Sequence, residues 1–412
     1  MKRKSIALMI GVFSAFFLLT TNLQAVEYVF AHGVDYTGPF SKVMPPIDEA
    51  AVAFIAWWND NIGKEIGVTV KRTVYDCRYD PAVVASQWPT IVAKDKPFAW
   101  IGIGAPYIVP IMKRLATDKV VATSPAPSYG FVWRPGLWVF QNRPTYAHEM
   151  AALLTWLHEN RIKDRPIRIG AFYTKVTAFV DMYDGIAAFA KQTPWLDLVG
   201  VEWVPMEPVS LLSQLMRLKE KKPDYIIIQT NTYQTKAVFK AQKQIGVKIP
   251  VLLTTHDGIQ MTARASGGYE LLEGNVYEVD GVDPGANTDS EGAKVFLEYK
   301  KKLGLKTNWS VMSSMQGAGD LMFLTALEKA VKKKGPDNVK GDDIYEAMYT
   351  PFTEKQLLGL SADLLFTKEA GFPMKSGVKI TTVKNGKPSV LTKDWVPVPK
   401  IPNYVKKKKA KN

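Results

Sequence analysis

The 412-residue sequence contains one cysteine and four histidines. The single cysteine, Cys77, excludes an intramolecular disulfide and any metal or iron–sulfur site built from several cysteines. It is either a reactive thiol beside Arg78 or, as is usual for a free cysteine, a small packed residue. His148 and His158 are ten residues apart, which is not the i, i+4 spacing of a helical metal pair. We therefore expect no metal site.

The sequence also lacks the short motifs of common enzyme classes. It has no G-x-S-x-G nucleophile elbow and no GxxxxGK[ST] phosphate loop. Gly102-Ile103-Gly104 follows a predicted strand, but Tyr107 occupies the position of the third glycine of a dinucleotide-binding fingerprint. We interpret this segment as a tight turn and expect neither a cofactor nor an enzymatic activity.

Past residue 26 there is no run of 18 apolar residues. The run that does exist lies at the start, where Lys2, Arg3 and Lys4 precede an apolar stretch over residues 6–19 and a small residue, Ala25. This pattern predicts a cleaved signal peptide over residues 1–25 and a soluble, periplasmic protein. The alternative is an uncleaved membrane anchor, which needs about 20 apolar residues. No cysteine lies near the cleavage point, which excludes a lipid anchor.

The formal net charge of +14 is concentrated at the two ends of the chain. Three of these charges lie in residues 1–25, and five belong to lysines of a basic tail over residues 406–412, so the body carries 14 − 3 − 5 = +6. We expect the tail to be solvated. Because the excess charge is mostly terminal, we expect no nucleic-acid partner.

Strand and helix patterns alternate along the chain. The hydrophobic content of 47% and the length predict a globular protein of two lobes. The first half reads as strands over 28–31, 68–75, 98–103 and 120–123, with helices over 47–60, 82–92 and 108–116. The second half reads as strands over 167–173, 198–203, 224–229 and 250–254, with helices over 147–160, 179–191, 211–220 and 235–245. We therefore expect an α/β protein with two Rossmann-like doubly wound sheets.

The last third of the chain adds helices and a hairpin. Helices are predicted over 290–303, 315–334 and 341–348, and the strand over 377–384 precedes the hairpin turn Asn385-Gly386. Polar and aromatic loops follow the predicted strands of both halves, and ligands bind at the carboxyl ends of strands in open α/β sheets. These loops are predicted over 32–44, 104–107, 124–129, 173–179, 230–233 and 255–260. Together they predict a cleft between the lobes that closes over a small solute by hinge motion.

A series of short motifs, in this order and spacing, resembles the leucine/isoleucine/valine-binding-protein family, the periplasmic type I solute receptors of ABC transporters. The resemblance covers nearly all of residues 26–395. Its motifs are Thr37-Gly38-Pro39-Phe40, Val74-Tyr75-Asp76, Asp80-Pro81, Ile101-Gly102, Thr123-Ser124-Pro125, the segment 239–247, Asp257-Gly258 and the segment 319–330.

The resemblance implies two lobes joined by three hinge crossovers. Lobe 1 would comprise residues 26–145 plus 277–365, and lobe 2 residues 146–276 plus 366–405. The family further implies a monomer that binds a small-molecule ligand, such as an amino acid, and delivers it to the membrane permease of an ABC transporter.

The resemblance also implies ligand-binding residues in the loops of both lobes. In this sequence they are Ala105, Tyr107, Ala126, Ser128, Tyr129, Phe179, Asn231, Thr232, Tyr233 and Asp257. Asp257 matches the acid that pairs with the ligand ammonium in amino-acid-binding members. Pro106 stands where a contacting serine is usual and has no N–H or hydroxyl to donate, so the ligand class stays open among branched-chain amino acids, amides and aromatic acids.

Each of these residues also has a purely structural interpretation. A tyrosine such as Tyr107 is often a rim or core aromatic, Asp257 before Gly258 suits a turn, and Ser128 suits a helix N-cap. Two other functions remain open at this point. One is a sensory ligand receptor on the same fold, and the other is a secreted α/β enzyme.

Overall fold

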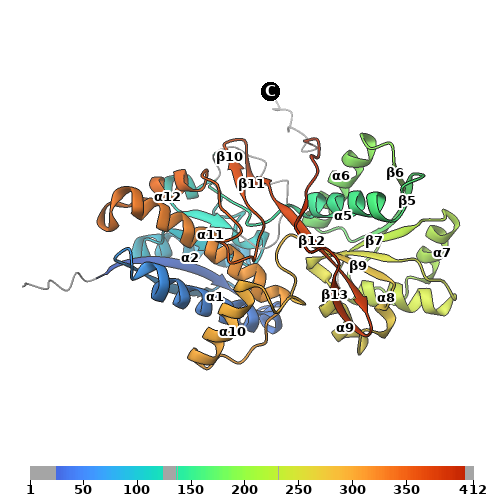
Figure 1. Cartoon of the computed structure of the whole chain (residues 1–412), viewed down its shortest axis with the longest axis horizontal. Helices are drawn as coiled ribbons and strands as arrows, with labels where there is room; N and C mark the ends of the chain where they lie inside the picture. Colours follow the sequence, from blue (N-terminus) through green and yellow to red (C-terminus); the bar gives the residue numbers. More distant parts are fainter. Residues whose placement is uncertain (1–24, 124–135, 137, 231, 404–412) are drawn as a thin grey trace, which may run out of the picture.

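The structure is a computed structural model that describes residues 25–123, 136, 138–230 and 232–403. The chain forms two α/β lobes side by side, as Figure 1 shows, and the predicted fold class is confirmed. Lobe 1 holds a parallel sheet in the order β2-β1-β3-β4. Its strands are β1 Val26–Val34, β2 Val68–Asp76, β3 Ala99–Ile101 and β4 Val121–Thr123.

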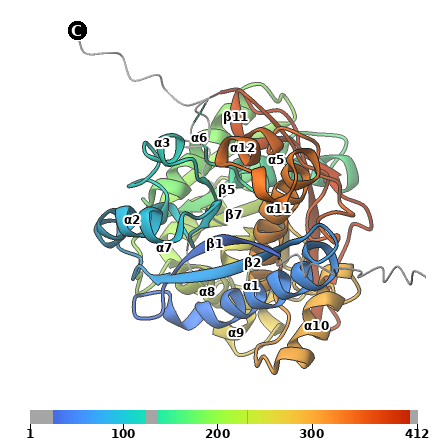
Figure 2. The same ribbon diagram turned by 90° about the vertical axis from the view of Figure 1, so that its left-hand side faces the viewer.

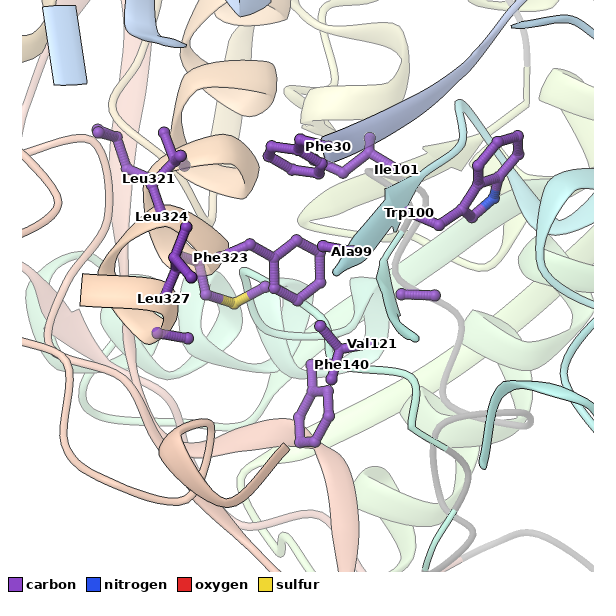
Figure 3. Packing of buried hydrophobic residues seen from close by; sticks show 14 of the residues in the cluster. Phe30, Ala99, Trp100, Ile101, Val121, Phe140, Leu321, Phe323, Leu324 and Leu327 are labelled. Carbon is purple, nitrogen blue, oxygen red and sulfur yellow. The ribbon is translucent and has the colours of Figure 1, made fainter. Parts of the chain in front are cut away.

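Helices cover both faces of the lobe 1 sheet. They are α1 Met44–Trp58, α2 Pro81–Asp95, α3 Leu115–Asp118, α10 Glu291–Leu303, α11 Val311–Lys334 and α12 Gly341–Ala347. Successive side chains along each strand point to opposite faces of the sheet, which explains the two layers of helices. The Trp100 ring lies 5.5 Å from the ring of Trp88 in α2, while the ring of Phe30 on β1 lies 5.9 Å from that of Phe323 in α11, on the other face (Figure 3). Figure 2 shows α2 and α11 on opposite sides of β1.

Lobe 2 holds an eight-stranded sheet in the order β13-β12-β9-β8-β7-β5-β6, with β14 paired to β12. Its strands are β5 Ile167–Tyr173, β6 Leu196–Trp203, β7 Tyr225–Gln229, β8 Val251–Thr254, β9 Val276–Asp280, β12 Gly377–Lys384, β13 Lys387–Val390 and β14 Val396–Pro397. Its helices are α5 Tyr146–Asn160, α6 Thr177–Lys191, α7 Leu212–Glu220, α8 Thr232–Gln244 and α9 Ile259–Ser266. Strands β5 to β9 are parallel, and β12 returns antiparallel to β9.

The chain passes between the lobes three times. The predicted lobe boundaries at 145/146, 276/277 and 365/366 stay predictions. Helix α5 begins at Tyr146, and β9 pairs with β8 and β12 in the lobe 2 sheet. The hairpin of β10 Leu365–Thr367 and β11 Ala370–Lys375 places Phe366 and Phe372 in the core of lobe 1.

Two local predictions differ from the structure. Residues 108–114 form hydrogen-bonded turns, and only α3 is helical in the range predicted as a helix over 108–116. Pro110 accounts for this because it has no N–H to donate and disfavours helical geometry at the residue before it. The loop predicted from residue 32 begins at Asp35, since β1 continues to Val34 with His32 buried inside it.

The hairpin prediction at Asn385-Gly386 is confirmed. Both residues have positive φ, 53° and 71°, which matches a type I′ turn, and the Glu273 carboxylate accepts hydrogen bonds from their two N–H groups. Within the described ranges, no helix is both long and apolar enough to span a membrane.

Candidate functional site between the lobes

The first crossover contacts the carboxyl ends of strands in both lobes. Phe140 N donates to Ala122 O at 2.8 Å, so this segment runs beside β4 and continues past its carboxyl end. Asn142 Nδ2 then donates to Met315 O of α11 at 3.1 Å. The next residue, Arg143, donates from Nη2 to Thr255 Oγ1 at 2.7 Å, directly after β8 of lobe 2. The carboxyl ends of the two sheets therefore meet at one junction.

A buried ion pair fixes the crossover to lobe 2. Arg143 donates to both carboxylate oxygens of Glu149 in α5, from Nε and Nη2, at 2.7 Å each. Burial lowers the pKa of Arg143, but the charge and hydrogen bonds of Glu149 outweigh it, so the net shift is upward and Arg143 stays charged. Its Nη1 lies 2.9 Å from Met315 Sδ, which gives the same guanidinium a contact in lobe 1.

Three rings lie together beside this ion pair. The His256 ring packs edge-on against Phe179, with centroids 4.8 Å apart, and lies 6.1 Å from the Tyr146 ring. The Arg143 guanidinium lies 5.6 Å from the Tyr146 centroid. Burial and, to a smaller extent, the positive charge of Arg143 lower the pKa of His256 to about 4. His256 is therefore neutral at pH 7, and the three rings form a largely apolar, uncharged wall.

A carboxyl pair supports the loop that carries Asp257. Glu278 on β9 accepts a hydrogen bond at Oε2 from Ile259 N at 2.9 Å, the first N–H of α9. A Cβ on Gly258 would lie 1.9 Å from Glu278 Oε1, so a larger residue there would displace the Glu278 carboxylate. Burial raises the pKa of Glu278 to about 7, and burial together with Glu278 raises the pKa of Asp280. One proton of this pair is therefore held at near-neutral pH.

Two aspartates hold the lobe 1 loop that follows β1. Asp35 accepts hydrogen bonds from Gly38 N at 2.6 Å and from Phe40 N at 2.7 Å. Asp76 at the end of β2 accepts from Tyr36 N and from the Thr37 hydroxyl, at 3.1 and 2.7 Å. The loop over residues 35–40 is thus tied to the carboxyl ends of two neighbouring strands.

Residues 29–387 match the family model described as periplasmic binding protein. The chain belongs to the periplasmic binding protein family. The resemblance found in the sequence is confirmed, and the family consists of solute-binding proteins rather than enzymes. No curated protein matches the chain in a sequence search.

Solved structures share the fold of this periplasmic binding protein. A branched-chain amino acid ABC transporter protein from Thermus thermophilus with bound valine has a TM-score of 0.75 at 17% identity, covering 91% of this chain and 97% of that chain. A leucine-binding protein from Thermotoga maritima has a TM-score of 0.67 at 18% identity, covering 89% and 98%. A fatty acid ABC transporter substrate-binding protein from Thermomonospora curvata has a TM-score of 0.67 at 19% identity, covering 90% and 95%.

The structure distributes the predicted site residues of this periplasmic binding protein unevenly. Phe179 belongs to the ring wall, and the backbone of Asp257 ends the short helix η4 Thr255–Asp257 at the same junction. Thr232 begins α8 half-buried, while the neighbouring Tyr233 is 74% exposed. Ala126, Ser128, Tyr129 and Asn231 lie outside the described residues.

Tyr107 is fully buried in the core of lobe 1. Its hydroxyl donates to Val34 O at 2.8 Å and accepts from Tyr79 N at 3.0 Å. These bonds join the carboxyl ends of β1 and β2 to the short helix η3 Ala105–Tyr107, in which Ala105 is half-buried. These contacts are those of a core aromatic residue, which is the structural interpretation of Tyr107.

Sequence reasoning did not single out Arg143, Tyr146, Glu149 or Glu278. Only His256 lay within a loop predicted to face the ligand, over residues 255–260. The missed residues lie on a helix, a crossover and a strand. Arg143 and Glu278 contact Thr255 and Ile259, which are 112 and 19 positions away, and no local pattern marks these contacts. In the described part of the chain, no cluster of three or more His, Cys, Asp or Glu residues has the arrangement of a metal site.

Proposed function

We propose that this protein is the substrate-binding component of an ABC transporter and captures a small polar solute between its two lobes. The observation that carries the proposal is the meeting of both sheets' carboxyl ends at the first crossover, where Asn142 contacts lobe 1 and Arg143 contacts lobe 2. Ligands bind at the carboxyl ends of strands in open α/β sheets, and two lobes on a few crossovers close around them by hinge motion.

The chemistry of the junction supports a ligand with a polar end and an apolar body. The rings of Phe179, Tyr146 and His256 form an uncharged, mostly buried cluster at the junction, and Asp257 belongs to the loop beside them. Branched-chain amino acids, amides and aromatic acids combine these two features. The relatives point in the same direction, since their names record valine, leucine and a fatty acid as ligands.

The cellular context follows from the proposed function and the leader-like segment over residues 1–25. We propose that the leader directs export, that the mature protein acts in the periplasm as a monomer, and that the loaded form docks on a membrane permease. Turnover of the ligand has no part in this function.

A thermal-shift screen of the purified chain from residue 26 onward tests the proposal. Its panel contains amino acids, amides, short carboxylates and aromatic acids, and any hit is followed by calorimetric titration and by analysis of the recovered ligand. We expect one class to raise the melting temperature and to be recovered unchanged. Product formation from the ligand would contradict a transport role.

The variant Asp257→Ala tests whether the Asp257 carboxylate contacts the amine of an amine-bearing ligand. We expect this variant to lose binding, whereas Asp197→Ala retains it, because Asp197 lies at the opposite end of the same sheet in an exposed pair with Arg168. Equal binding of an amine ligand by wild type and Asp257→Ala would remove Asp257 from the site.

A further inference from the structure

A groove of about 500 Å³ lies at the second and third crossovers. One wall is the start of the connection from β9 to α10, including Asp283, and another is the turn over residues 354–359 of lobe 1. Lys379 of β12 and Lys393 complete it from lobe 2. We call this space the hinge groove. None of the residues of the ring wall, nor Arg143, lines it.

Asp283, one of the residues that line the hinge groove, has a buried carboxylate oxygen without a hydrogen-bond partner among the described residues. The residue is 1% exposed, and its Oδ1 accepts a hydrogen bond from Asn287 Nδ2 at 2.8 Å. Its other oxygen, Oδ2, has no hydrogen-bond partner among the described residues. Burial, only partly offset by Asn287, Ser290 and Lys379, raises the pKa of Asp283 to about 6. A buried carboxylate oxygen without a donor is costly, and a ligand N–H would satisfy it.

Lys379 presents unused donors to the same groove. Its side chain is buried, with Nζ bonded to the carbonyl of Lys393 and placed 4.9 Å from the centre of the Trp395 ring. An ammonium has three donors, and the hydrogen bonds of the described residues use one of them. Burial lowers the pKa of Lys379, while Glu354 and then Asp283 act in the opposite direction.

Asp283 and Lys379 carry opposite charges, so a ligand that pairs with both needs a positive and a negative group. A simple cation would be repelled by Lys379, and a simple anion would be repelled by Asp283. The exposed Lys355 and Lys393 and the exposed Glu291 and Glu354 continue the mixture of signs along the walls. The volume falls within the range of small-molecule sites, about 300–1,000 Å³.

We infer that the hinge groove is a second binding site, for a small zwitterion of the amino-acid type, with its ammonium on Asp283 and its carboxylate on Lys379. Because the walls come from both lobes, an occupant stabilises one hinge arrangement over others. Trp395 Nε1 donates to Glu354 Oε1 at 2.9 Å across the same boundary, so the groove is built at a point where the lobes already touch. By linkage, the occupant changes the affinity of the site between the lobes, and the reverse holds equally.

The Trp395 indole serves as a reporter of binding. Its ring touches Lys379 and its N–H is bonded to Glu354, both groove residues. We propose ¹⁵N-indole NMR of the full chain during titration with glycine, L-valine, L-glutamate and L-lysine, with the signal assigned by Trp395→Phe. We expect at least one of these zwitterions to shift the Trp395 signal saturably.

Two matched pairs of variants locate the effect. Asp283→Asn and Lys379→Met should each weaken the saturable shift at least tenfold. Asp289→Asn, in the same connection, and Lys384→Met, on the same strand, lie outside the groove and should leave it unchanged. Asp257→Ala, which removes a contact of the proposed transport site, should still show a saturable Trp395 shift, and this separates the two sites. A silent Trp395 signal with all four probes, or a shift that persists in both groove variants, would overturn the inference.

Discussion

Arg143 and Glu149 form a two-point ion pair in which neither side chain is exposed to solvent, with Nε–Oε1 and Nη2–Oε2 distances of 2.7 Å. The pair joins the first crossover to α5, and further hydrogen bonds of Arg143 reach Thr255 and Met315. The geometry of the junction between the lobes therefore depends on one guanidinium group.

Removal of Arg143 should strongly destabilise the protein. Arg143→Ala leaves the Glu149 carboxylate buried without its partner, which costs about 3–5 kcal/mol in comparable cases. The matched control is Arg165→Ala, which breaks a similar two-point pair with Asp224 on the surface, where the Arg165 side chain is 48% exposed. There we expect a much smaller loss, because solvent screens an exposed pair. Urea unfolding measures both, and similar losses in the two variants would contradict the assignment.

Glu278 should make stability depend on pH near neutrality. Its pKa is raised from 4.5 to about 7, so the folded state keeps a proton that the unfolded state has released. This contribution is fully present below pH 4.5 and is lost as the pH rises through 7. Because Asp280 shares the titration, the pair titrates as a unit.

Glu278→Gln should remove this dependence and keep an acceptor for Ile259 N. Between pH 5 and pH 8 we expect the free energy of unfolding of Glu278→Gln to rise relative to wild type by about 2–3 kcal/mol. His148 and His256, whose pKa values are also shifted, contribute equally to both proteins and cancel in this difference. The exposed Glu220→Gln should leave the profile unchanged. A constant difference across this range would show that Glu278 is already ionised at pH 5.

Two glycines of α11 should respond in opposite ways to alanine. A Cβ on Gly317 would lie 2.3 Å from the ring of Phe54 in α1, whereas a Cβ on Gly319 would have Ile101 as its nearest neighbour at 3.3 Å. Overpacking costs about 1–3 kcal/mol, and alanine raises helix propensity by up to about 1 kcal/mol. Gly317→Ala should thus lower the melting temperature and Gly319→Ala should hold or raise it. A more stable Gly317→Ala would mean that α1 and α11 pack less closely than the structure has them.

Removal of the hydroxyl group should destabilise the protein at the buried Tyr107 but not at the exposed Tyr233. Tyr107→Phe leaves Tyr79 N without its acceptor, whereas Val34 O keeps the hydrogen bond from Cys77 N, so we expect a cost of about 1–3 kcal/mol for the one unsatisfied group. Tyr233→Phe, at a side chain that is 74% exposed, should change stability by less than about 0.5 kcal/mol. Chemical denaturation distinguishes them, and an unchanged midpoint for Tyr107→Phe would return Tyr107 to the list of candidate ligand contacts.

The architecture was predictable because it is encoded locally. Alternating strand and helix patterns gave both sheets, and Asn385-Gly386 predicted the hairpin from turn chemistry alone. The pairing of β9 with β12, a strand about 100 residues later, was not predictable, because nothing near residue 277 marks it.

The site was less predictable because its partners are distant in sequence. His32 is bonded to Asp320 in the lobe 1 core at 2.9 Å, across 288 positions, so a residue that was predicted to begin a loop proves to be internal. Arg143 and Glu149 are only six residues apart, yet their sequence neighbourhood does not reveal that both are buried. Burial is a property of the packed lobes and is absent from the local pattern.

Cys77 makes the central claim directly measurable. It is the only cysteine, and it is buried with its pKa raised to about 12 by burial, so introduced thiols react selectively. Val109 after β3 and Val209 after β6 are 52% and 106% exposed, one on each lobe and both beyond the carboxyl ends of their sheets.

We propose spin labels at Val109→Cys and Val209→Cys and pulsed dipolar measurement of their distance with and without the solute selected by the thermal-shift screen. Closure of the lobes around the ligand predicts a shorter and narrower distance distribution at saturation, and no change with Asp257→Ala if the ligand carries an amine. Saturating binding with an unchanged distance distribution would contradict capture by hinge closure.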